Sequence, residues 1–358
     1  MTNRSAIFTG TEQPPPQLAL DLAALQTYLA ARVEGLREPL QAAKFKGGQS
    51  NPTYLVSSGA QRFVLRRRPP GKLLESAHAI DREFRVLEAL KSSGVPVPQP
   101  VLYCADEAII GSQFYVAEYV EGRVFWDAEL PGVNVANERA AIYSSLCSVF
   151  ARLHSLDAAA VGLSDLGRAG EYCARNFARW SKIYEQSKLI EIPEMDWLRE
   201  QLPRAMPSAE TSTLIHGDYG LYNLIVHPTR PDVMAVLDWE MATIGDPLVD
   251  LAHHLRAWWD LPDANGAATT LRGQDLDALG IPTMQQYIDQ YCQQRGVAVP
   301  DMRFYLAYAQ YRYAAMIQGI LKRVQSGTIS TRSVLHRQER VIEIARLSRQ
   351  TLEGGVSL

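Results

Sequence analysis

Two neighbouring segments near the middle of the chain carry polar side chains where simple strands and turns would not need them. The first, residues 214–226, begins as an apolar run and continues into His216 and Asp218, with Asn223 five positions after the aspartate. The second is another apolar run, which ends in Asp238. Asp and Asn are common turn formers, so a hairpin with incidental polar residues is the simplest alternative. The second aspartate at this distance, together with matching features of the N-terminal part, argues against that alternative.

An Asp, an Asn five residues later and a second Asp after another strand form the catalytic pattern of phosphoryl transfer. The first Asp accepts the proton of the substrate hydroxyl, and the other two residues hold the Mg²⁺ ions that bridge the nucleotide phosphates. Protein kinases have H-R-D-x-x-x-x-N and D-F-G at these places, and this chain has H-G-D-x-x-x-x-N and D-W-E. We therefore predict Asp218 and His216 as catalytic residues, with His216 anchoring the loop, and Asn223 and Asp238 as Mg²⁺ ligands.

The H-G-D form of the motif resembles the aminoglycoside phosphotransferase and choline kinase branch of the kinase-like fold. This resemblance implies an α+β, bilobal, protein-kinase-like fold with a small antiparallel N-terminal lobe and a mostly helical C-terminal lobe. Residues 1–16 are polar and end in three prolines, so we expect a flexible lead-in there. Residues 17–119 are expected to form the nucleotide-binding lobe, residues 118–122 the hinge, and residues 123–358 the helical lobe with the catalytic loop and the acceptor site.

A Gly-Gly turn between two predicted strands is the first candidate phosphate-binding feature. It lies within residues 45–56 and is followed by Ser50 and Asn51. Backbone N–H groups and short polar side chains in such a turn can bind phosphate oxygens. Most Gly-Gly turns only reverse the chain, so the turn alone is weak support for a phosphate site. The catalytic motif downstream makes phosphate binding by Ser50 and Asn51 the favoured interpretation.

The third predicted strand, residues 63–66, ends in Arg66 at the position where kinases have the lysine of V-A-I-K. An arginine is permanently charged and binds phosphate through two parallel hydrogen bonds. The positive charge beside the phosphates is therefore kept, while the geometry of the contact changes. The expected partner is Glu83, on the predicted helix 79–90. The alternative is that Glu83 is an ordinary surface residue.

The predicted strand 113–119 leads into the hinge. In the kinase-like fold the backbone of this segment binds adenine, so we predict that Glu118 and Val120 contact the nucleotide. The side chains of a hinge are little constrained, and the sequence does not distinguish ATP from GTP.

Several polar residues of the helical lobe have a structural explanation. His154 ends the predicted central helix 140–156 and is expected to be a packed, structural histidine. Asp246 precedes a proline at the start of a helix, which is a favourable capping arrangement. In the family, the equivalent of Asp250 ties this helix back to the catalytic loop. Tyrosines at helical spacing along residues 302–325 are expected to be core residues.

Composition excludes several classes of protein. The formal net charge of −3 gives no indication of binding to nucleic acid or to an anionic membrane surface. The four cysteines are scattered without a C-x-x-C pair, which disfavours a zinc site and a disulfide framework. The chain has no apolar run long enough to span a membrane and no signal-like N-terminus. We expect a cytoplasmic protein.

The nature of the acceptor depends on weaker signals. The segment between Asp238 and Asp250 is too short for an activation loop, which disfavours a regulated protein kinase and favours a small-molecule kinase. From residue 251 onward there are 9 Asp and Glu against 12 Lys and Arg. A positive balance disfavours a polycationic aminoglycoside and favours an anionic acceptor, although solvated surface charges are an alternative explanation.

Residues 47–54, 64–67, 70–78 and 237–247 look like one sub-branch of the same family. It is the phosphotransferase branch that is fused to acyl-CoA dehydrogenases in some eukaryotes and encoded beside them in bacteria, and the resemblance covers residues 20–330. It implies ATP and Mg²⁺ as cofactors and the hydroxyl of a 4-hydroxyacyl-CoA as acceptor, in hydroxy-acid catabolism. It also implies a separate acyl-CoA dehydrogenase as a functional neighbour.

Two alternatives stay open. One is a kinase of aminoglycosides, choline or homoserine. The other is a non-catalytic protein that binds nucleotide or acyl-CoA, for which the missing lysine at Arg66 is the sequence argument. The presence of Asp218, Asn223 and Asp238 together argues against the second.

Overall fold

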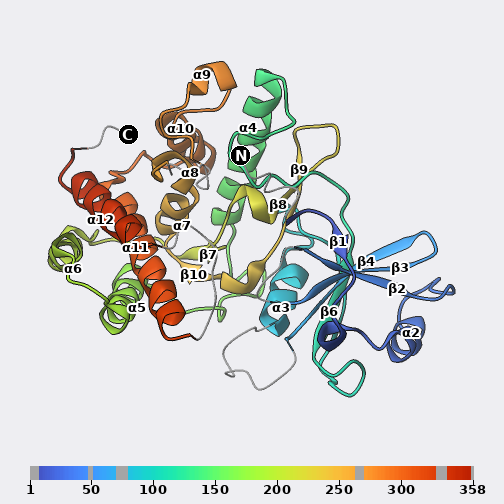
Figure 1. Cartoon of the computed structure of the whole chain (residues 1–358). Coiled ribbons are helices and arrows are strands. Elements are labelled where there is room, and N and C mark those ends of the chain that lie inside the picture. The colour runs from blue at the N-terminus through green and yellow to red at the C-terminus, as the bar shows by residue number, and fades with distance from the viewer. Residues whose placement is uncertain (1–7, 47–50, 70–79, 263–269, 328–336, 356–358) are drawn as a thin grey trace.

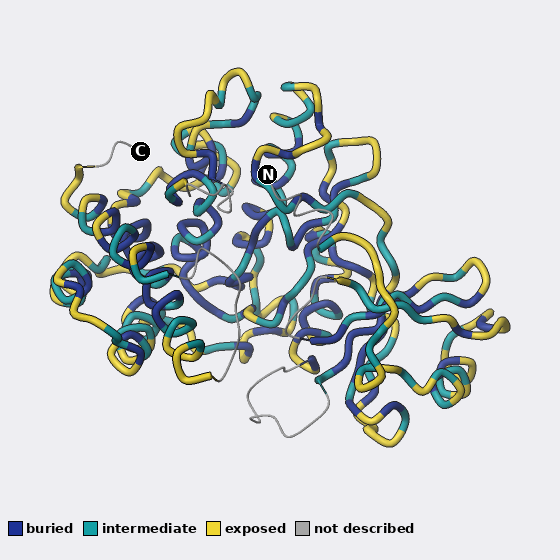
Figure 2. The backbone as a smooth tube through the Cα atoms, viewed as in Figure 1, coloured by how far each residue is buried: buried dark blue, intermediate teal, exposed yellow. Residues whose placement is uncertain are grey.

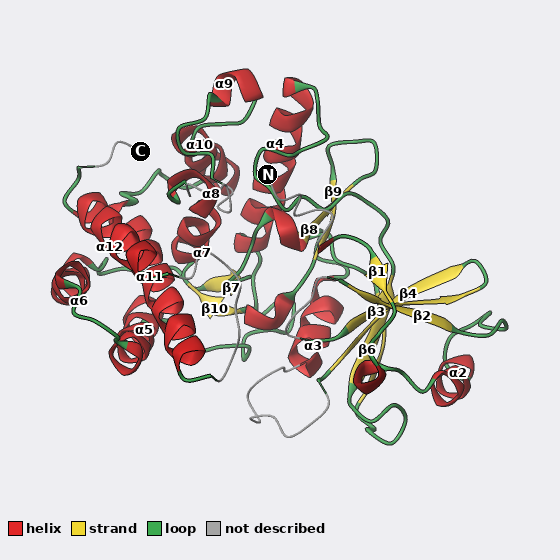
Figure 3. Cartoon of the chain, in the orientation of Figure 1, coloured by secondary structure: helices red, strands yellow, loops and turns green. Residues whose placement is uncertain are grey.

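The computed structural model describes residues 8–46, 51–69, 80–262, 270–327 and 337–355 (Figure 1). They form two lobes, one built on a six-stranded antiparallel sheet and the other mainly of helices. Figure 3 shows how completely the strands of the large sheet and the long helices are separated between the lobes. The predicted α+β, bilobal fold is therefore confirmed.

The large sheet is covered on both faces because its side chains alternate between them. Its strands run in the order β1 (Thr11–Glu12), β2 (Gln41–Phe45), β3 (Thr53–Ser58), β4 (Gln61–Arg67), β6 (Phe114–Glu118) and β5 (Pro100–Cys104). On β6, Phe114 and Val116 join the core under α2 (Leu22–Ala30), whereas Tyr115 and Ala117 join the larger core with α3 (Ile80–Leu90). This alternation follows from the two-residue period of a strand.

The N-terminal segment differs from the expected flexible lead-in over residues 1–16. In its described part, Thr11 pairs with Phe45 of β2, and Glu12 pairs with Lys44. The ammonium nitrogen of Lys44 also lies 3.1 Å from a carboxylate oxygen of Glu12. The polar, proline-rich composition of the segment did not reveal this strand, because the stabilising hydrogen bonds come from a distant sheet edge rather than from local periodicity.

The helical lobe surrounds two short sheets. Its helices are α4 (Ala136–His154), α5 (Tyr172–Ser187), α6 (Pro193–Ala205), α7 (Pro247–His254), α8 (Arg256–Trp259), α9 (Leu276–Leu279), α10 (Met284–Arg295), α11 (Arg303–Gln325) and α12 (Gln338–Leu352). β7 (Thr213–Ile215) pairs with β10 (Thr243–Gly245), and β8 (Leu224–Val226) pairs with β9 (Val233–Val236). The tyrosines of α11 are buried, as predicted. None of the described helices has the length and apolar character needed to cross a membrane.

Helix α3 joins the two lobes and so fixes the position of the residues that it carries into the cleft. Its buried residues share one hydrophobic core with the helical lobe, and Figure 2 shows buried, dark-blue segments in both lobes. Arg82 on the same helix donates hydrogen bonds to the carbonyl oxygens of Leu166 (2.8 Å) and Ala242 (3.4 Å). Apolar burial and these two bonds hold α3 against the helical lobe.

Candidate active site

The loop that carries the H-G-D motif lies between β7 and β8, and its first turn requires a glycine. Gly217 has a φ of 84°, in the left-handed region. A Cβ atom there would lie 2.8 Å from the carbonyl oxygen of Met241. A side chain at this position would therefore meet both an unfavourable backbone conformation and a steric clash. This explains why the chain has H-G-D at the position of the kinase H-R-D.

Asp250, on α7, ties that helix to the start of the loop. Its buried carboxylate accepts hydrogen bonds from the backbone N–H groups of His216 (2.7 Å) and Gly217 (3.0 Å), and it lies 3.3 Å from Nε2 of His154. Burial by itself would raise the pKa of Asp250, but the hydrogen bond and charge of His154 outweigh it and lower the pKa. Asp246 caps the same helix through the N–H of Leu248 at 2.8 Å. The predicted bracing and capping geometry is present.

His216 is buried and makes two hydrogen bonds through its ring. Nε2 lies 2.9 Å from the carbonyl oxygen of Leu237, so it carries the proton and donates. Nδ1 then accepts from the backbone N–H of Asp218 at 3.2 Å. The ring thus links the start of the catalytic loop to the residue before Asp238. This geometry suits an anchoring residue rather than one that exchanges protons with a substrate.

Asp218 projects from the loop and is surrounded by hydrogen-bond donors. Its Oδ1 accepts from the hydroxyl of Tyr222 (2.7 Å) and from Nε2 of His253 (3.2 Å), and its Oδ2 accepts from Nδ2 of Asn223 (3.1 Å). Burial by itself would raise the pKa of Asp218, but the hydrogen bonds from His253 and Tyr222 and the nearby charge outweigh it and lower the pKa to about 2. The carboxylate is therefore ionised at neutral pH.

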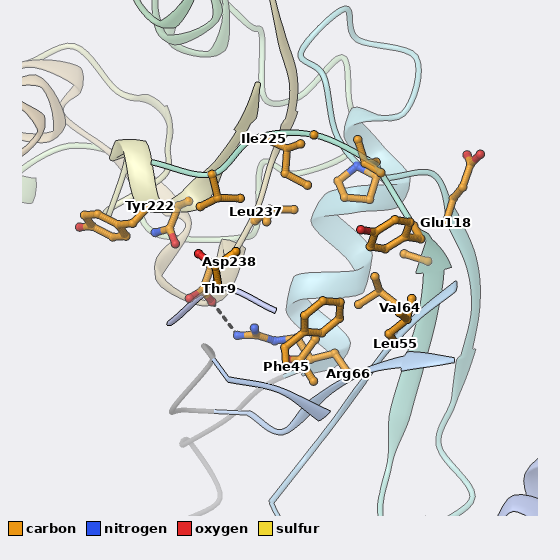
Figure 4. A pocket seen from close by; sticks show the side chains of 18 of the residues that line it. Thr9, Phe45, Leu55, Val64, Arg66, Glu118, Tyr222, Ile225, Leu237 and Asp238 are labelled. Atoms are coloured by element: carbon orange, nitrogen blue, oxygen red, sulfur yellow. Dashed lines mark hydrogen bonds and ion pairs between the residues drawn. The ribbon is translucent and has the colours of Figure 1, made fainter. Parts of the chain in front are cut away.

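The two residues predicted to bind Mg²⁺ direct oxygen atoms toward the cleft. Nδ2 of Asn223 donates to both the backbone oxygen (2.9 Å) and the carboxylate of Asp218, which orients the amide and leaves Oδ1 for a cation. Asp238 has a φ of 63°, in the left-handed region. This conformation turns the chain sharply at the end of the strand, and Figure 4 shows the Asp238 carboxylate at the polar end of the pocket. Aspartate tolerates such a conformation better than most residues do.

Arg66 is the charged centre of the cleft. Its Nε lies 2.9 Å from Glu83, and its Nη2 lies 2.6 Å from Asp238 and 3.5 Å from Glu240 (Figure 4 marks the pair with Asp238). The structure thus brings Glu83 to Arg66, and Glu83 is buried rather than at the surface. Burial by itself would lower the pKa of Arg66, but the neighbouring carboxylates outweigh it and raise the pKa, so the guanidinium stays charged.

The polar end of the cleft has an excess of negative charge that suits a divalent cation. Glu83, Asp238 and Glu240 surround the single guanidinium of Arg66. Burial, together with repulsion from the other two carboxylates, raises the pKa of Glu83 to about 7. The available donors are carboxylate and amide oxygens, the ligands that Mg²⁺ prefers. Asn223 and Asp238 therefore fit this ion by chemistry and by position.

The cleft between the lobes has a volume of about 480 Å³. Leu55 and Val64 line it from the sheet, and Ile225 and Leu237 from the helical lobe (Figure 4). Two apolar walls of this kind suit a flat aromatic ring, and the volume is in the range of small-molecule sites.

The predicted hinge residues Glu118 and Val120 line one end of this cleft. Within the described part of the chain, no hydrogen bond engages the backbone N–H or C=O of Val120, so both groups are available to a ligand.

The predicted phosphate turn is only partly visible. Ser50 lies outside the described residues. Asn51 is buried, and its Nδ2 lies 3.4 Å from Glu240. None of the described residues donates a hydrogen bond to its Oδ1. Asn51 therefore lies beside the charged cluster around Arg66.

Comparison with known proteins identifies the family of the chain. The sequence matches the phosphotransferase enzyme family over residues 41–287. The chain belongs to this family. This phosphotransferase is 42% identical over 352 residues to rat acyl-CoA dehydrogenase family member 11, and 42% identical over 294 residues to mouse acyl-CoA dehydrogenase family member 10. The alignments cover 94% and 82% of this chain but only 44% and 27% of those relatives, so the chain spans less than half their length.

Solved structures agree with this assignment. A protein from Ralstonia eutropha, described as a candidate aminoglycoside phosphotransferase, is 40% identical and superposes with a TM-score of 0.85 over 94% of this chain and 99% of its own. Choline kinase from Cryptosporidium parvum superposes with a TM-score of 0.66 at 11% identity, covering 94% of this chain and 97% of that one, which shows the shared fold. The protein is an enzyme that transfers phosphoryl groups to hydroxyl acceptors.

Sequence reasoning missed several residues of the phosphotransferase site. His253 follows Asp250 by nearly one helical turn, and this spacing was the available signal that both face the catalytic loop. Tyr222 lies inside the motif itself, but nothing in the pattern indicated that its hydroxyl reaches Asp218.

A missed aromatic group lies beside Tyr222 and also lines the cleft. The ring of Phe8 packs 4.8 Å from that of Trp126, which stacks on Tyr222 at 6.4 Å between ring centres. Phe8 and Trp126 come from separate parts of the chain, and no local pattern connects them.

Proposed function

We propose that this phosphotransferase transfers the γ-phosphoryl group of ATP to the hydroxyl of a small anionic acceptor, a hydroxyacyl-CoA of the 4-hydroxyacyl type. The observation that carries the proposal is that Asn223 and Asp238 line the polar end of one apolar cleft, and that Asn223 is hydrogen-bonded to Asp218. Arg66 lies at the same end, where the phosphates of a nucleotide held by the apolar walls would lie.

In this proposal Asp218 binds the acceptor hydroxyl and takes its proton. Its Oδ1 already accepts two hydrogen bonds, whereas Oδ2 accepts one from Asn223 within the described residues. A carboxylate oxygen has two lone pairs, so Oδ2 can accept the hydroxyl proton. A pKa of about 2 makes Asp218 a weak base. Positioning nevertheless matters more than base strength in phosphoryl transfer, whose transition state is largely dissociative.

The remaining residues bind and orient the nucleotide. Arg66, oriented by Glu83, would bind the phosphates, with Ser50 and Asn51 covering them, and the backbone of Glu118 and Val120 would bind the base. Mg²⁺ held by Asn223 and Asp238 would neutralise charge that develops on the phosphates. His216 would hold the loop in place.

The acceptor class is inferred from the relatives and from charge. The relatives are named as acyl-CoA dehydrogenases, and the chain matches less than half of each. This supports a function beside a separate dehydrogenase in acyl-CoA metabolism. The positive balance of the C-terminal part, 12 Lys and Arg against 9 Asp and Glu, supports an anionic acceptor.

Mass spectrometry on the purified protein tests the proposal. The protein is incubated with ATP, Mg²⁺ and, in separate reactions, 4-hydroxypentanoyl-CoA, 4-hydroxypentanoate, kanamycin, choline or homoserine. We expect a phosphorylated product from the CoA ester. The matched control is Asp218→Asn, which keeps the shape of the side chain and should lower turnover by about 10²–10⁴-fold. Near-normal turnover by this variant would contradict the assignment of Asp218.

An aminoglycoside kinase is the second candidate, because the similar Ralstonia protein is described in those terms. Phosphorylation of kanamycin, with no reaction on the CoA ester, would favour it. Nucleotide binding without any transfer would favour a non-catalytic binding protein.

A further inference from the structure

Two arginines near the catalytic aspartate have guanidinium groups that make no hydrogen bond to any residue described by the structure. Arg256 is the first residue of α8, and its guanidinium carbon lies 4.5 Å from the ring centre of Tyr313. Arg312 lies in the middle of α11, and its guanidinium carbon lies 5.4 Å from the ring centre of Trp180. Both side chains are half-buried. Each charge therefore rests on an aromatic face.

The carboxylate beside Arg256 is shared with another arginine. Oδ2 of Asp260 lies 3.8 Å from Nε of Arg256, beyond hydrogen-bond distance. Oδ1 of Asp260 lies 2.6 Å from Nη2 of the fully buried Arg340, so the shorter contact of this carboxylate is with Arg340. Arg312 has no carboxylate partner among the described residues. Among the described residues, Arg256, Arg312 and Arg340 thus carry three positive charges against the one negative charge of Asp260.

The position of the two arginines connects them to the reaction. Helices α7 and α11 pack together, and His253 on α7 donates to Asp218. Burial, first of all, and then the charges of Arg312 and Arg256 lower the pKa of His253, so both guanidinium groups lie within electrostatic range of its ring. Arg256 is also within range of Asp218 and Tyr222.

The two arginines do not belong to the proposed nucleotide site. Neither Arg256 nor Arg312 lines the cleft between the lobes, whereas Arg66 does. Asp218 does not line that cleft either, and Arg256 lies within electrostatic range of it. A half-buried guanidinium that makes no hydrogen bond to the described residues has lost part of its hydration without a hydrogen bond in return. An anionic group of the acceptor would supply that missing partner.

We propose that Arg256 and Arg312 are specificity-determining residues that bind an anionic group, a carboxylate or a phosphate, on the acceptor. The inference rests on the proposed function, since it assigns the acceptor side of the same site. It predicts that the enzyme selects acidic hydroxyl compounds and rejects polycations, because a cationic acceptor would meet the two positive charges of these arginines.

The test compares Arg256→Gln and Arg312→Gln with the wild type on three acceptors that share one hydroxyacyl group. These are 4-hydroxypentanoyl-CoA, which carries phosphates, 4-hydroxypentanoate, which carries a carboxylate, and the neutral N-acetylcysteamine thioester. We expect KM for the anionic acceptors to rise by about tenfold or more, the loss typical of a hydrogen bond to a charged group. KM for the neutral thioester and for ATP should change less than about twofold.

Two further variants make the comparison specific. Arg256→Lys keeps the charge and should recover part of the loss. Arg323→Gln removes an exposed arginine from the same helix as Arg312 and should leave all kinetic constants unchanged. Thermal unfolding of each variant shows whether the fold is intact, and the two single variants at separate helices guard against failure of one to fold.

The outcomes separate the possibilities. A loss restricted to the CoA thioester identifies a phosphate as the bound anion, and a loss restricted to the free acid identifies a carboxylate. An equal loss on the neutral thioester, or no loss on either anion, overturns the inference while the proposed function stands. Calorimetric titration of CoA and of 4-hydroxypentanoate covers the remaining case. If the wild type transfers no phosphoryl group but binds either anion, and the arginine variants weaken that binding, the proposed function fails and the anion site stands. If the wild type transfers no phosphoryl group and the arginine variants bind the anions as well as the wild type does, or if no anion binds, both the proposed function and the anion site are overturned.

Discussion

Arg66 and Asp238 are separated by 172 residues in the chain, yet Nη2 of the arginine lies 2.6 Å from Oδ1 of the aspartate. One is the residue predicted to bind phosphate, and the other is predicted to bind Mg²⁺. Each therefore neutralises the other in the structure. Binding of a nucleotide with its metal ion would exchange this contact for one between arginine and phosphate and one between carboxylate and cation. The pair keeps both side chains aimed into the cleft.

The first prediction concerns the stability of the cluster around Arg66. Arg66→Ala leaves the buried Glu83 without its cation, so at about pH 8 we expect a loss of about 3–5 kcal/mol in the free energy of unfolding. Urea denaturation measures this. The double variant Arg66→Ala with Glu83→Gln should recover part of the loss, because the uncompensated charge is gone. An Arg66→Ala protein as stable as the wild type would show that the ion pair contributes nothing.

The second prediction is a dependence of stability on pH that originates at Glu83. Burial, and then repulsion from Asp238 and Glu240, raise the pKa of Glu83 from 4.5 to about 7 in the folded protein. Between these values the folded state holds a proton that the unfolded state has released, so the contribution of Glu83 to stability falls as pH rises through this window. Glu83→Gln, which cannot titrate, should lack this part of the pH dependence.

Unfolding free energies at about pH 5 and about pH 8 for both proteins measure the effect. We expect the wild type to lose more stability than Glu83→Gln over this range. A constant difference between the two proteins would show that the pKa of Glu83 is not raised.

The third prediction concerns the hydrogen bond from Tyr222 to Asp218, which is 2.7 Å long. Tyr222→Phe removes a donor to a charged group, which is typically worth about 1.5–3 kcal/mol. Part of this hydrogen-bond energy stabilises the ground state and the transition state equally and does not affect the rate. We therefore expect kcat to fall by about tenfold with little change in KM for ATP. Tyr103→Phe is the matched control, because its hydroxyl bonds to Gln113 in the sheet, away from the site. Equal effects of the two variants would exclude a specific contribution of Tyr222.

The fourth prediction concerns the turn at Gly217. Gly217→Ala and Gly111→Ala both place a side chain at a left-handed φ, of 84° and 80°. This alone costs about 1–2 kcal/mol. At Gly111 nothing lies within 4 Å of the added carbon, whereas at Gly217 it would lie 2.8 Å from a carbonyl oxygen. Gly217→Ala should therefore be the more destabilising in thermal unfolding and should also reduce turnover. Similar melting temperatures for the two variants would show that the loop at Gly217 rearranges to accommodate the added carbon at little cost in stability.

The family resemblance implied the fold class, and the motifs that carry this resemblance reflect local constraints. The H-G-D motif needs a glycine where the turn is left-handed and crowded, and Asp246 precedes a proline at the start of a helix, where its side chain satisfies a free N–H. The family resemblance placed Asp250 behind the catalytic loop, and the structure has it there.

Contacts between distant segments were not predictable in the same way. Strand β1 pairs with a sheet edge about thirty residues away, and Trp126 packs against Phe8 from a distant part of the chain. Glu240 was visible in the motif, but its distance of 3.5 Å from Arg66 depends on how the two lobes dock. Such contacts carry no periodic signal, since neither partner changes the local preferences of its own segment.

The sequence by itself determined the chemistry that this protein carries: an aspartate, an asparagine and a second aspartate at the spacing of phosphoryl transfer, on a kinase-like fold. Only the tertiary structure decided which charges are neutralised. It shares Arg66 among several carboxylates, gives Asp260 to Arg340, and leaves Arg256 and Arg312 without hydrogen bonds within the described residues. The physical reason is that an ion pair depends on distance and burial in space, and packing of remote helices and strands sets both.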